Sequence, residues 1–221
     1  MKPMLKICGL KTNEAVDAAR LAGASHLGFI FFPKSPRHLE ILQASELAKR
    51  AKNVQTVAVT VDAGDDYLDA IVNTMKPTML QLHGSETIER VAELKARYAL
   101  PLIKALAVKT ADELTKAKTY EEFIEYLLLE AKPPKGSDLP GGNGVSFDWS
   151  LVKTFKSKSP VLLSGGVDLD NLSEAMMLVR NDANSIQGLD VSSGVESSAG
   201  VKDILKIEAF LANCQLAGNV S

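Results

Sequence analysis

Short apolar runs alternate with longer amphipathic stretches along the whole chain. The short runs are rich in Val, Ile, Leu and Phe, and several are apolar at every position, which is typical of strands buried on both faces of a sheet. The pattern predicts strands over Met4–Cys8, His26–Phe31, Gln55–Val61, Met79–Leu82, Leu102–Ala105, Tyr126–Leu129, Val161–Leu163 and Ser185–Leu189.

The amphipathic stretches between these runs place apolar residues at the three- and four-residue spacing of a helix. Residues that commonly begin helices stand just before three of them: Thr12, Ser85 with Glu86, and Asp168. The pattern predicts helices over Asn13–Leu21, Asp65–Met75, Thr87–Tyr98, Ala111–Ala117, Asp148–Lys156, Leu169–Val179 and Val201–Leu211.

This alternation predicts eight strand–helix units joined by right-handed crossovers, and therefore a parallel sheet. Eight such units in 221 residues suit a closed (β/α)8 TIM barrel of the α/β class. Because no linker rich in Pro, Gly or Ser divides the chain, we expect residues 1–221 to form a single domain. An open doubly wound sheet built from the same units is the alternative.

Composition limits the partners. The chain is 46% hydrophobic and 24% charged, which is ordinary for a soluble globular protein. Its net charge of −2 shows no basic bias, so nucleic acid is not an expected partner, although a local basic site can still bind a small anion. No apolar run approaches the roughly 18 residues that span a bilayer, and the first ten residues do not match a secretory signal. We expect a cytoplasmic protein without membrane contacts.

The two cysteines, Cys8 and Cys214, lie near opposite ends of the chain. Neither belongs to a CxxC or Cys/His spacing, so we expect no metal site and two reduced thiols. Cys214, in the last predicted helix, is typical of a buried or interface thiol. Cys8 is different because it ends the first predicted strand, and the chemistry of a TIM barrel takes place at the carboxyl ends of its strands.

Two glycine-bearing loops follow the last two predicted strands, "LSGGV" with Gly165 and Gly166 and "DVSSGVE" with Ser192, Ser193 and Gly194. Each alone is typical of a tight turn. Together they occupy the loops that commonly bind phosphate in this fold, through backbone N–H groups that glycine leaves accessible. The pair therefore predicts a phosphorylated small-molecule ligand.

Three further strand ends carry candidate chemistry. Arg37, in "FFPKSPRHL", can clamp a carboxylate with two parallel hydrogen bonds, which the nearby Lys34 cannot do. Glu130 ends an apolar strand, where partial burial favours the protonated form and suits a general acid. His83, in "LQLHG", either lines the pocket or packs at the strand end. Solvated or structural roles remain open for all three residues.

A long loop follows Glu130 and contains "GGNG", with Gly142 and Asn143. Loops of this length in compact domains are often functional, so this one is a candidate cover or backbone ligand for the substrate.

Taken together, these stretches resemble the phosphoribosylanthranilate isomerase family of tryptophan biosynthesis. The matching segments are "KICGL", "GFIFFPKSPRHL", "QLHG", "GGNG" followed by "FDW", "LSGGV" and "LDVSSGVE", which cover nearly the whole chain. The resemblance implies a (β/α)8 barrel that catalyses an Amadori rearrangement, in which N-(5'-phosphoribosyl)anthranilate becomes 1-(2-carboxyphenylamino)-1-deoxyribulose 5-phosphate. This reaction needs a general acid and a general base but no cofactor or metal, and the resemblance leaves a monomer or a homodimer open.

The resemblance also implies roles for individual residues. Cys8 is the general base and Arg37 the contact to the anthranilate carboxylate. Gly166, Ser193 and Gly194 bind the phosphate, with Asp190 beside them at the end of the last strand.

Two departures separate this chain from the family pattern. Glu130 stands where the family usually has Asp, which moves the carboxyl outward by about one ångström, and a shift of that size can cost ~10²-fold in rate. Either the strand end compensates or another carboxylate, such as Asp138, is the acid. Asn143 replaces a common Thr, a milder change.

Two other readings stay open. Another phosphosugar barrel enzyme, such as an indole-glycerol-phosphate synthase or a histidine-pathway aminoaldose isomerase, shares the phosphate loops; the isomerase usually has an aspartate where this chain has Cys8. A non-catalytic barrel that binds a phosphorylated metabolite would keep the same loops without needing an acid and a base.

Overall fold

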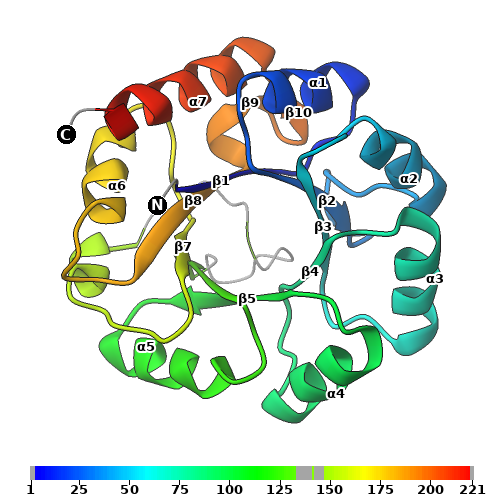
Figure 1. The fold of residues 1–221 in the computed structure, drawn as a ribbon, viewed down its shortest axis with the longest axis horizontal. Coiled ribbons are helices and arrows are strands. Elements are labelled where there is room, and N and C mark those ends of the chain that lie inside the picture. Colours follow the sequence, from blue (N-terminus) through cyan, green and yellow to red (C-terminus); the bar gives the residue numbers. More distant parts are fainter. Residues whose placement is uncertain (1–2, 133–140, 142–146, 220–221) are drawn as a thin grey trace.

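The computed structural model describes residues 3–132, 141 and 147–219. Parallel strands β1 to β8 pair in sequence order and β8 returns to β1, so they close into a barrel, which confirms the predicted (β/α)8 fold and excludes the open sheet. Figure 1 looks along this barrel and shows the helices as an outer ring. The strands are β1 (Met4–Cys8), β2 (His26–Phe31), β3 (Gln55–Thr60), β4 (Met79–Leu82), β5 (Leu102–Val108), β6 (Tyr126–Ala131), β7 (Val161–Leu163) and β8 (Ile186–Val191).

The outer ring and the loops contain the remaining elements. After β8, two short strands, β9 (Glu196–Ser198) and β10 (Val201–Lys202), form a separate antiparallel pair. The helices are α1 (Asn13–Leu21), α2 (Ile41–Lys49), α3 (Asp65–Met75), α4 (Ile88–Tyr98), α5 (Ala111–Ala117), α6 (Leu172–Val179) and α7 (Ile204–Asn219), with three 3-10 turns, η1 (Lys118–Tyr120), η2 (Trp149–Val152) and η3 (Ser193–Val195).

Several expected boundaries were wrong. The stretch Asp148–Lys156 contains only the 3-10 turn η2 instead of a helix, and α2 was not predicted. Thr12 accepts a hydrogen bond from the Ala15 N–H and caps α1 as expected. The N-cap of α4 is Thr87, and not Ser85 or Glu86 as expected. Asp168 closes a turn before the Asn171 cap of α6.

The buried apolar residues form two separate sets. The larger set lies between the strands and the surrounding helices, and includes Leu5 and Ile7 of β1. The smaller set fills the barrel interior: Met4, Cys8, Val57, Val59, Met79, Ile103, Ala105, Leu128 and Leu162. Because side chains alternate across a strand, this division identifies the inward positions of each strand.

Polar side chains occupy inward positions toward the carboxyl ends of five strands. In β1, β4, β6 and β7 they alternate with the interior apolar set, and all five are at least nine-tenths buried. Burying polar groups without partners is costly, so a polar layer inside a barrel indicates either an internal network or a site. The five are Lys6, Gln81, Glu130, Ser164 and Asp190.

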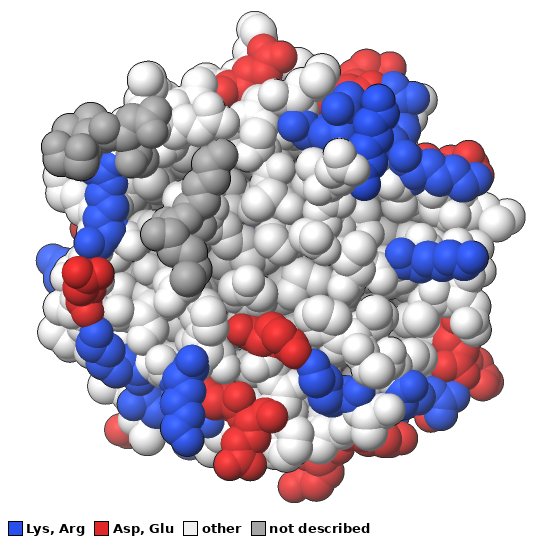
Figure 2. All heavy atoms as spheres, in the orientation of Figure 1, with Lys and Arg blue, Asp and Glu red and all other residues white. Residues whose placement is uncertain are grey.

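Charged side chains at the surface are mixed. On the face that Figure 2 draws, Lys and Arg are interspersed with Asp and Glu around the rim, and few charges lie near the centre. In the part of the chain that the structure describes, no helix is long and apolar enough to cross a membrane.

Candidate active site

Cys8 lies inside the barrel at the end of β1, beside an ion pair that crosses to β8. Lys6 Nζ lies 2.7 Å from Asp190 Oδ1, and Lys6 and Asp190 are register partners in adjacent strands. A Cβ atom placed on Gly28 of β2 would lie 2.9 Å from Cys8 Sγ and 3.2 Å from Lys6 Nζ. The thiol and the ammonium group therefore border the same point of the barrel wall.

The charges around Cys8 act in opposite directions. Burial raises the pKa of the Cys8 thiol above its ordinary value, and the charge of Asp190 raises it further. The charges of Lys6 and, more weakly, Lys202 lower it but do not outweigh burial, so the pKa of Cys8 is raised overall. Burial alone would lower the pKa of Lys6, but Asp190 and Cys8 outweigh it and raise that pKa, so Lys6 is an ammonium ion although it is fully buried.

Lys202 of β10 places a second buried amino group near Cys8, and burial lowers its pKa although Glu196 opposes that shift. Its Nζ donates to Ser192 O at 2.8 Å, to Ser192 Oγ at 3.3 Å and to Glu196 Oε1 at 2.8 Å, so its three N–H bonds are used. Ser192 Oγ in turn donates to the Cys8 carbonyl at 3.1 Å. The Ser192 hydroxyl, expected to contact phosphate, thus joins β10 to the end of β1.

The guanidinium group of Arg37 is held in one plane by the carboxylate of Glu196, which is distant in the sequence. Its Nε and Nη2 donate to the two oxygens of Glu196 at 2.7 and 2.8 Å, and both side chains are about nine-tenths or more buried. Burial works to raise the pKa of Glu196, but Arg37 and Lys202 outweigh it and lower that pKa. This bidentate pair fixes the plane of the guanidinium, as a carboxylate clamp requires.

On the opposite side of the barrel, Glu130 of β6 pairs with His83. His83 Nε2 is hydrogen-bonded to Glu130 Oε1, and the Gln81 amide Nε2 lies 3.0 Å from His83 Nδ1. Gln81 and Glu130 therefore contact the two ring nitrogens of His83 and fix the orientation of the imidazole ring. A Cβ atom on Gly141 would lie 2.7 Å from Glu130 Oε1, so the described part of the long loop reaches this carboxyl group.

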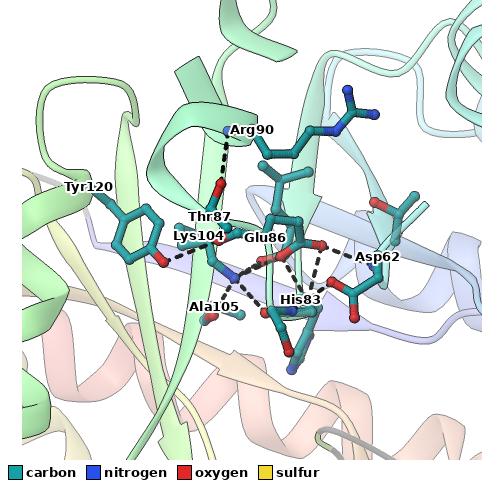
Figure 3. Close-up of polar contacts among 12 residues, drawn as sticks. Asp62, His83, Glu86, Thr87, Arg90, Lys104, Ala105 and Tyr120 are labelled. Carbon is teal, nitrogen blue, oxygen red and sulfur yellow. Dashed lines mark hydrogen bonds and ion pairs between the residues drawn. The ribbon is translucent and has the colours of Figure 1, made fainter. Parts of the chain in front are cut away.

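The main chain around His83 is held from outside the barrel by Lys104 of β5. Lys104 Nζ donates to the carbonyl oxygens of Leu82 and Gly84, at 3.3 and 2.8 Å, on either side of His83. Its counterion is Glu86, whose Oε2 lies 2.8 Å away (Figure 3).

Glu86 has a further role in this cluster. Its carboxylate accepts the N–H groups of Gly84 and Asp62, so it ties the β4 loop to the β3 loop. The Tyr120 hydroxyl donates to the Glu86 carbonyl at 3.1 Å. Figure 3 shows these groups converging behind His83. Glu86 was expected to support a helix start, but it is the buried partner of Lys104 instead.

The two candidate phosphate loops lie against each other. Gly165 and Gly166 have φ values of +69° and +76°, a conformation that glycine adopts without steric cost. A Cβ atom on Gly194 would lie 3.0 Å from the Asp168 Cα atom, so η3 after β8 packs on the loop after β7. The carboxylate of Asp190, expected beside the phosphate, pairs with Lys6 and accepts the Ser164 hydroxyl at 3.0 Å.

Other expected residues lie outside the described part of the chain. Gly142, Asn143 and the alternative acid Asp138 are among them, so their predicted roles stay predictions. Both cysteines have free thiols. Among the described residues, no group of three or more His, Cys, Asp or Glu side chains could hold a metal ion.

Sequence reasoning missed four polar residues that complete the site. Lys6 and Gln81 left a signal, because each interrupts an apolar strand in phase with Cys8 or His83, and period-two alternation places such residues on one face. Glu196 and Lys202 left no comparable signal, because their partners are distant in the chain; Arg37 and Glu196 are 159 positions apart.

Comparisons with known proteins agree with this geometry. A family model described as N-(5'phosphoribosyl)anthranilate (PRA) isomerase matches residues 5–213. The protein named N-(5'-phosphoribosyl)anthranilate isomerase from Rhizobium meliloti (strain 1021) is 52% identical over 211 residues, which cover 95% of this chain and 96% of that protein.

Solved structures show the same likeness. The phosphoribosyl anthranilate isomerase of Thermotoga maritima matches with a TM-score of 0.84 at 31% identity, over 97% of this chain and 99% of that one. A phosphoribosyl anthranilate isomerase in complex with reduced 1-(o-carboxyphenylamino)-1-deoxyribulose 5-phosphate matches with a TM-score of 0.80 at 29% identity, over the same shares of both chains.

Proposed function

The chain belongs to the N-(5'-phosphoribosyl)anthranilate isomerase family, and from this membership we propose how its barrel performs the reaction. The enzyme is an aldose–ketose isomerase of tryptophan biosynthesis. It converts N-(5'-phosphoribosyl)anthranilate into 1-(2-carboxyphenylamino)-1-deoxyribulose 5-phosphate. The ribose ring opens to a Schiff base, the C2 proton is removed, and the resulting enolamine tautomerises to the ketone.

Cys8 is the general base that removes the C2 proton. The thiolate is the reactive form of cysteine, and each general acid or base typically contributes 10²–10⁴-fold to a rate. The buried position of Cys8 keeps bulk water from the sulfur, and the charges of Lys6 and Lys202 oppose the effect of burial on its pKa.

Glu130 is the general acid that protonates the ring oxygen as the C1–O bond breaks. The hydrogen bond with His83 Nε2 occupies Oε1, so Oε2 is left to carry the transferred proton. The same contact holds the longer glutamate side chain in place. It thereby compensates for the outward shift of the carboxyl group that follows from having Glu where the family usually has Asp. His83 is thus a positioning residue for the acid in this proposal.

The other site residues bind the two ends of the substrate. Arg37, held in plane by Glu196, takes the anthranilate carboxylate. The backbone N–H groups of the loops with Gly165, Gly166, Ser193 and Gly194 take the phosphate. We further infer one domain over residues 1–221, a cytoplasmic location, and a monomer or homodimer.

One observation carries this function beyond family membership. Cys8 and Glu130 end non-adjacent strands of one barrel interior, and each has its own polar partner, Lys6 for the thiol and His83 for the carboxyl. A barrel that only binds a phosphorylated metabolite has no need for either arrangement.

The test is a coupled steady-state assay with phosphoribosylanthranilate made in situ. Wild type should turn over and Cys8→Ala should lose at least about a hundredfold in kcat while keeping its circular-dichroism spectrum. An inert, folded wild type would reject the isomerase. Turnover of a histidine-pathway aminoaldose instead of phosphoribosylanthranilate would assign the chain to the related reaction.

A further inference from the structure

The interior ion pair between Lys6 and Asp190 lies beside the proposed base. Lys6 is 0% exposed, and among the described residues it forms one ion pair, to Asp190, which leaves two N–H bonds of the ammonium group for other acceptors. Cys8 is the polar group beside them, since its sulfur and Lys6 Nζ border the same position on β2.

We propose that Lys6 is a positioning residue for the reaction base, whose ammonium group stabilises the thiolate of Cys8. This inference rests on the proposed function. Lys6 exchanges no proton in the step: the C2 proton passes to the Cys8 sulfur, the C2–H electron pair stays on the substrate, and Lys6 remains an ammonium ion throughout.

Asp190 and Ser164 explain why Lys6 keeps its charge at such a depth. Asp190 Oδ1 holds the ammonium group, and Asp190 Oδ2 accepts the Ser164 hydroxyl, so the carboxylate is itself fixed. The order is therefore Asp190 to Lys6 to Cys8, in which a third group orients the one that activates the nucleophile or base.

The other charged groups near the sulfur do not replace Lys6. Lys202 of β10 also favours the thiolate, but its three N–H bonds go to Ser192 and Glu196. Asp190 of β8 opposes the thiolate. His26 of β2 has its pKa lowered to about 4 by burial and by Lys6, so it is neutral at pH 7 and adds no positive charge.

The test compares kcat/KM against pH for wild type, Lys6→Met and Lys6→Arg. An adjacent opposite charge typically moves a pKa by about 1–3 units. Lys6→Met should therefore move the rising limb of the profile by about one to three pH units toward alkaline pH and lower kcat/KM at pH 7 by roughly 10–10³-fold. Lys6→Arg keeps the charge and should stay within one pH unit of wild type.

A second measurement separates this inference from the proposed function. Ultraviolet absorbance of the thiolate, in a Cys214→Ala background, reports the ionisation of Cys8 without any turnover. Its midpoint should move upward in Lys6→Met by the same amount as the rate profile. Lys104→Met is the matched control, because it also removes a fully buried ammonium group, from outside the barrel, and should leave this midpoint unchanged.

Unmoved midpoints in a folded Lys6→Met protein would overturn the inference while leaving the isomerase intact. If Lys6→Met fails to fold because Asp190 is left unpaired, Lys6→Met/Asp190→Asn removes both charges. Because Asp190 opposes the thiolate, this double variant should show a smaller upward shift than Lys6→Met alone, and a midpoint at or below that of wild type would overturn the proposal. Inactivity of wild type, with a normal shift of the thiol midpoint, would reject the function and not the role of Lys6.

Discussion

Two lysines, Lys6 and Lys104, are completely buried in this barrel, on opposite sides of its wall. Lys6 points inward and meets side chains, the Asp190 carboxylate and the Cys8 thiol. Lys104 points outward and meets mainly the main chain, the carbonyl oxygens of Leu82, Gly84 and Ala105, besides the carboxylate of Glu86. Lys6 borders the thiol that we propose as the base and can change its chemistry, whereas Lys104 donates to backbone carbonyl oxygens and fixes a strand end.

Burial of a charged side chain therefore does not by itself identify a catalytic role. What distinguishes the two ions is whether their partners can gain or lose a proton during the reaction. Four variants test this distinction, because each acts on one side of the wall.

Lys104→Met should have the largest effect on stability. It leaves Glu86 buried without its counterion, and breaking a buried pair in this way typically costs about 3–5 kcal/mol. Urea denaturation followed by circular dichroism measures the loss in the free energy of unfolding. Lys49→Met, which removes a surface pair with Glu46, is the control and should cost less than ~1 kcal/mol. A loss below ~1 kcal/mol for Lys104→Met would mean that the Lys104–Glu86 ion pair does not stabilise the fold.

The lowered pKa of His26, inside the barrel, predicts how the free energy of unfolding depends on pH. Its folded pKa of about 4, lowered by burial and by Lys6, lies below the ordinary histidine value of 6.5, so the unfolded chain binds the proton more tightly. The stability is complete above pH 6.5 and falls as the pH drops toward 4, by roughly 3 kcal/mol in total. His26→Gln should flatten urea-denaturation stability across this window. An unchanged slope would contradict the assignment.

Glu130→Asp restores the family's usual residue and should still lower kcat. His83 is placed to hold the longer side chain, so a shorter one withdraws the carboxyl by about one ångström from both His83 and the substrate. A displacement of that size costs up to ~10²-fold. Steady-state kcat measures the effect, and His83→Ala in the Asp background is the control: it should add little further loss, since the contact is already broken. A kcat at or above wild type would show that His83 does not hold the acid.

Gly28→Ala should have the smallest effect of the four. The added Cβ would lie 2.9 Å from Cys8 Sγ and 3.2 Å from Lys6 Nζ, which forces the sulfur or the ammonium group to shift by a few tenths of an ångström. Overpacking of this kind typically costs about 1–3 kcal/mol in stability. The kcat should fall with it, whereas Gly64→Ala, where a Cβ meets nothing within 4 Å, should leave kcat unchanged.

The fold was largely predictable from the sequence because its strands are continuous apolar runs, and β1, β2, β4 and β7 have the predicted bounds. Helix α2 was missed because it buries only Ala44 and Leu47 and has no side-chain cap, while Leu42 is 74% exposed. An apolar stripe this narrow gives no periodic signal.

The site was predictable only in part. Cys8, Arg37, His83 and Glu130 follow from their places at strand ends. The pairing of Lys6 with Asp190 does not, because the two are 184 positions apart and only barrel closure makes them neighbours. The role of Glu86 was also misread. Glu86 precedes a helix in the sequence, but its carboxylate pairs with Lys104 of β5.

The most direct test of the whole account measures kcat for Glu130→Ala and Asp138→Ala side by side, with Cys8→Ala as the benchmark for loss of one proton-transfer group. If Glu130 is the acid, Glu130→Ala and Cys8→Ala should each fall by at least about a hundredfold, with near-normal folding and little change in KM, while Asp138→Ala stays near wild type. A Glu130→Ala enzyme that keeps wild-type turnover would contradict it, because the acid would then lie away from the carboxyl group that His83 holds.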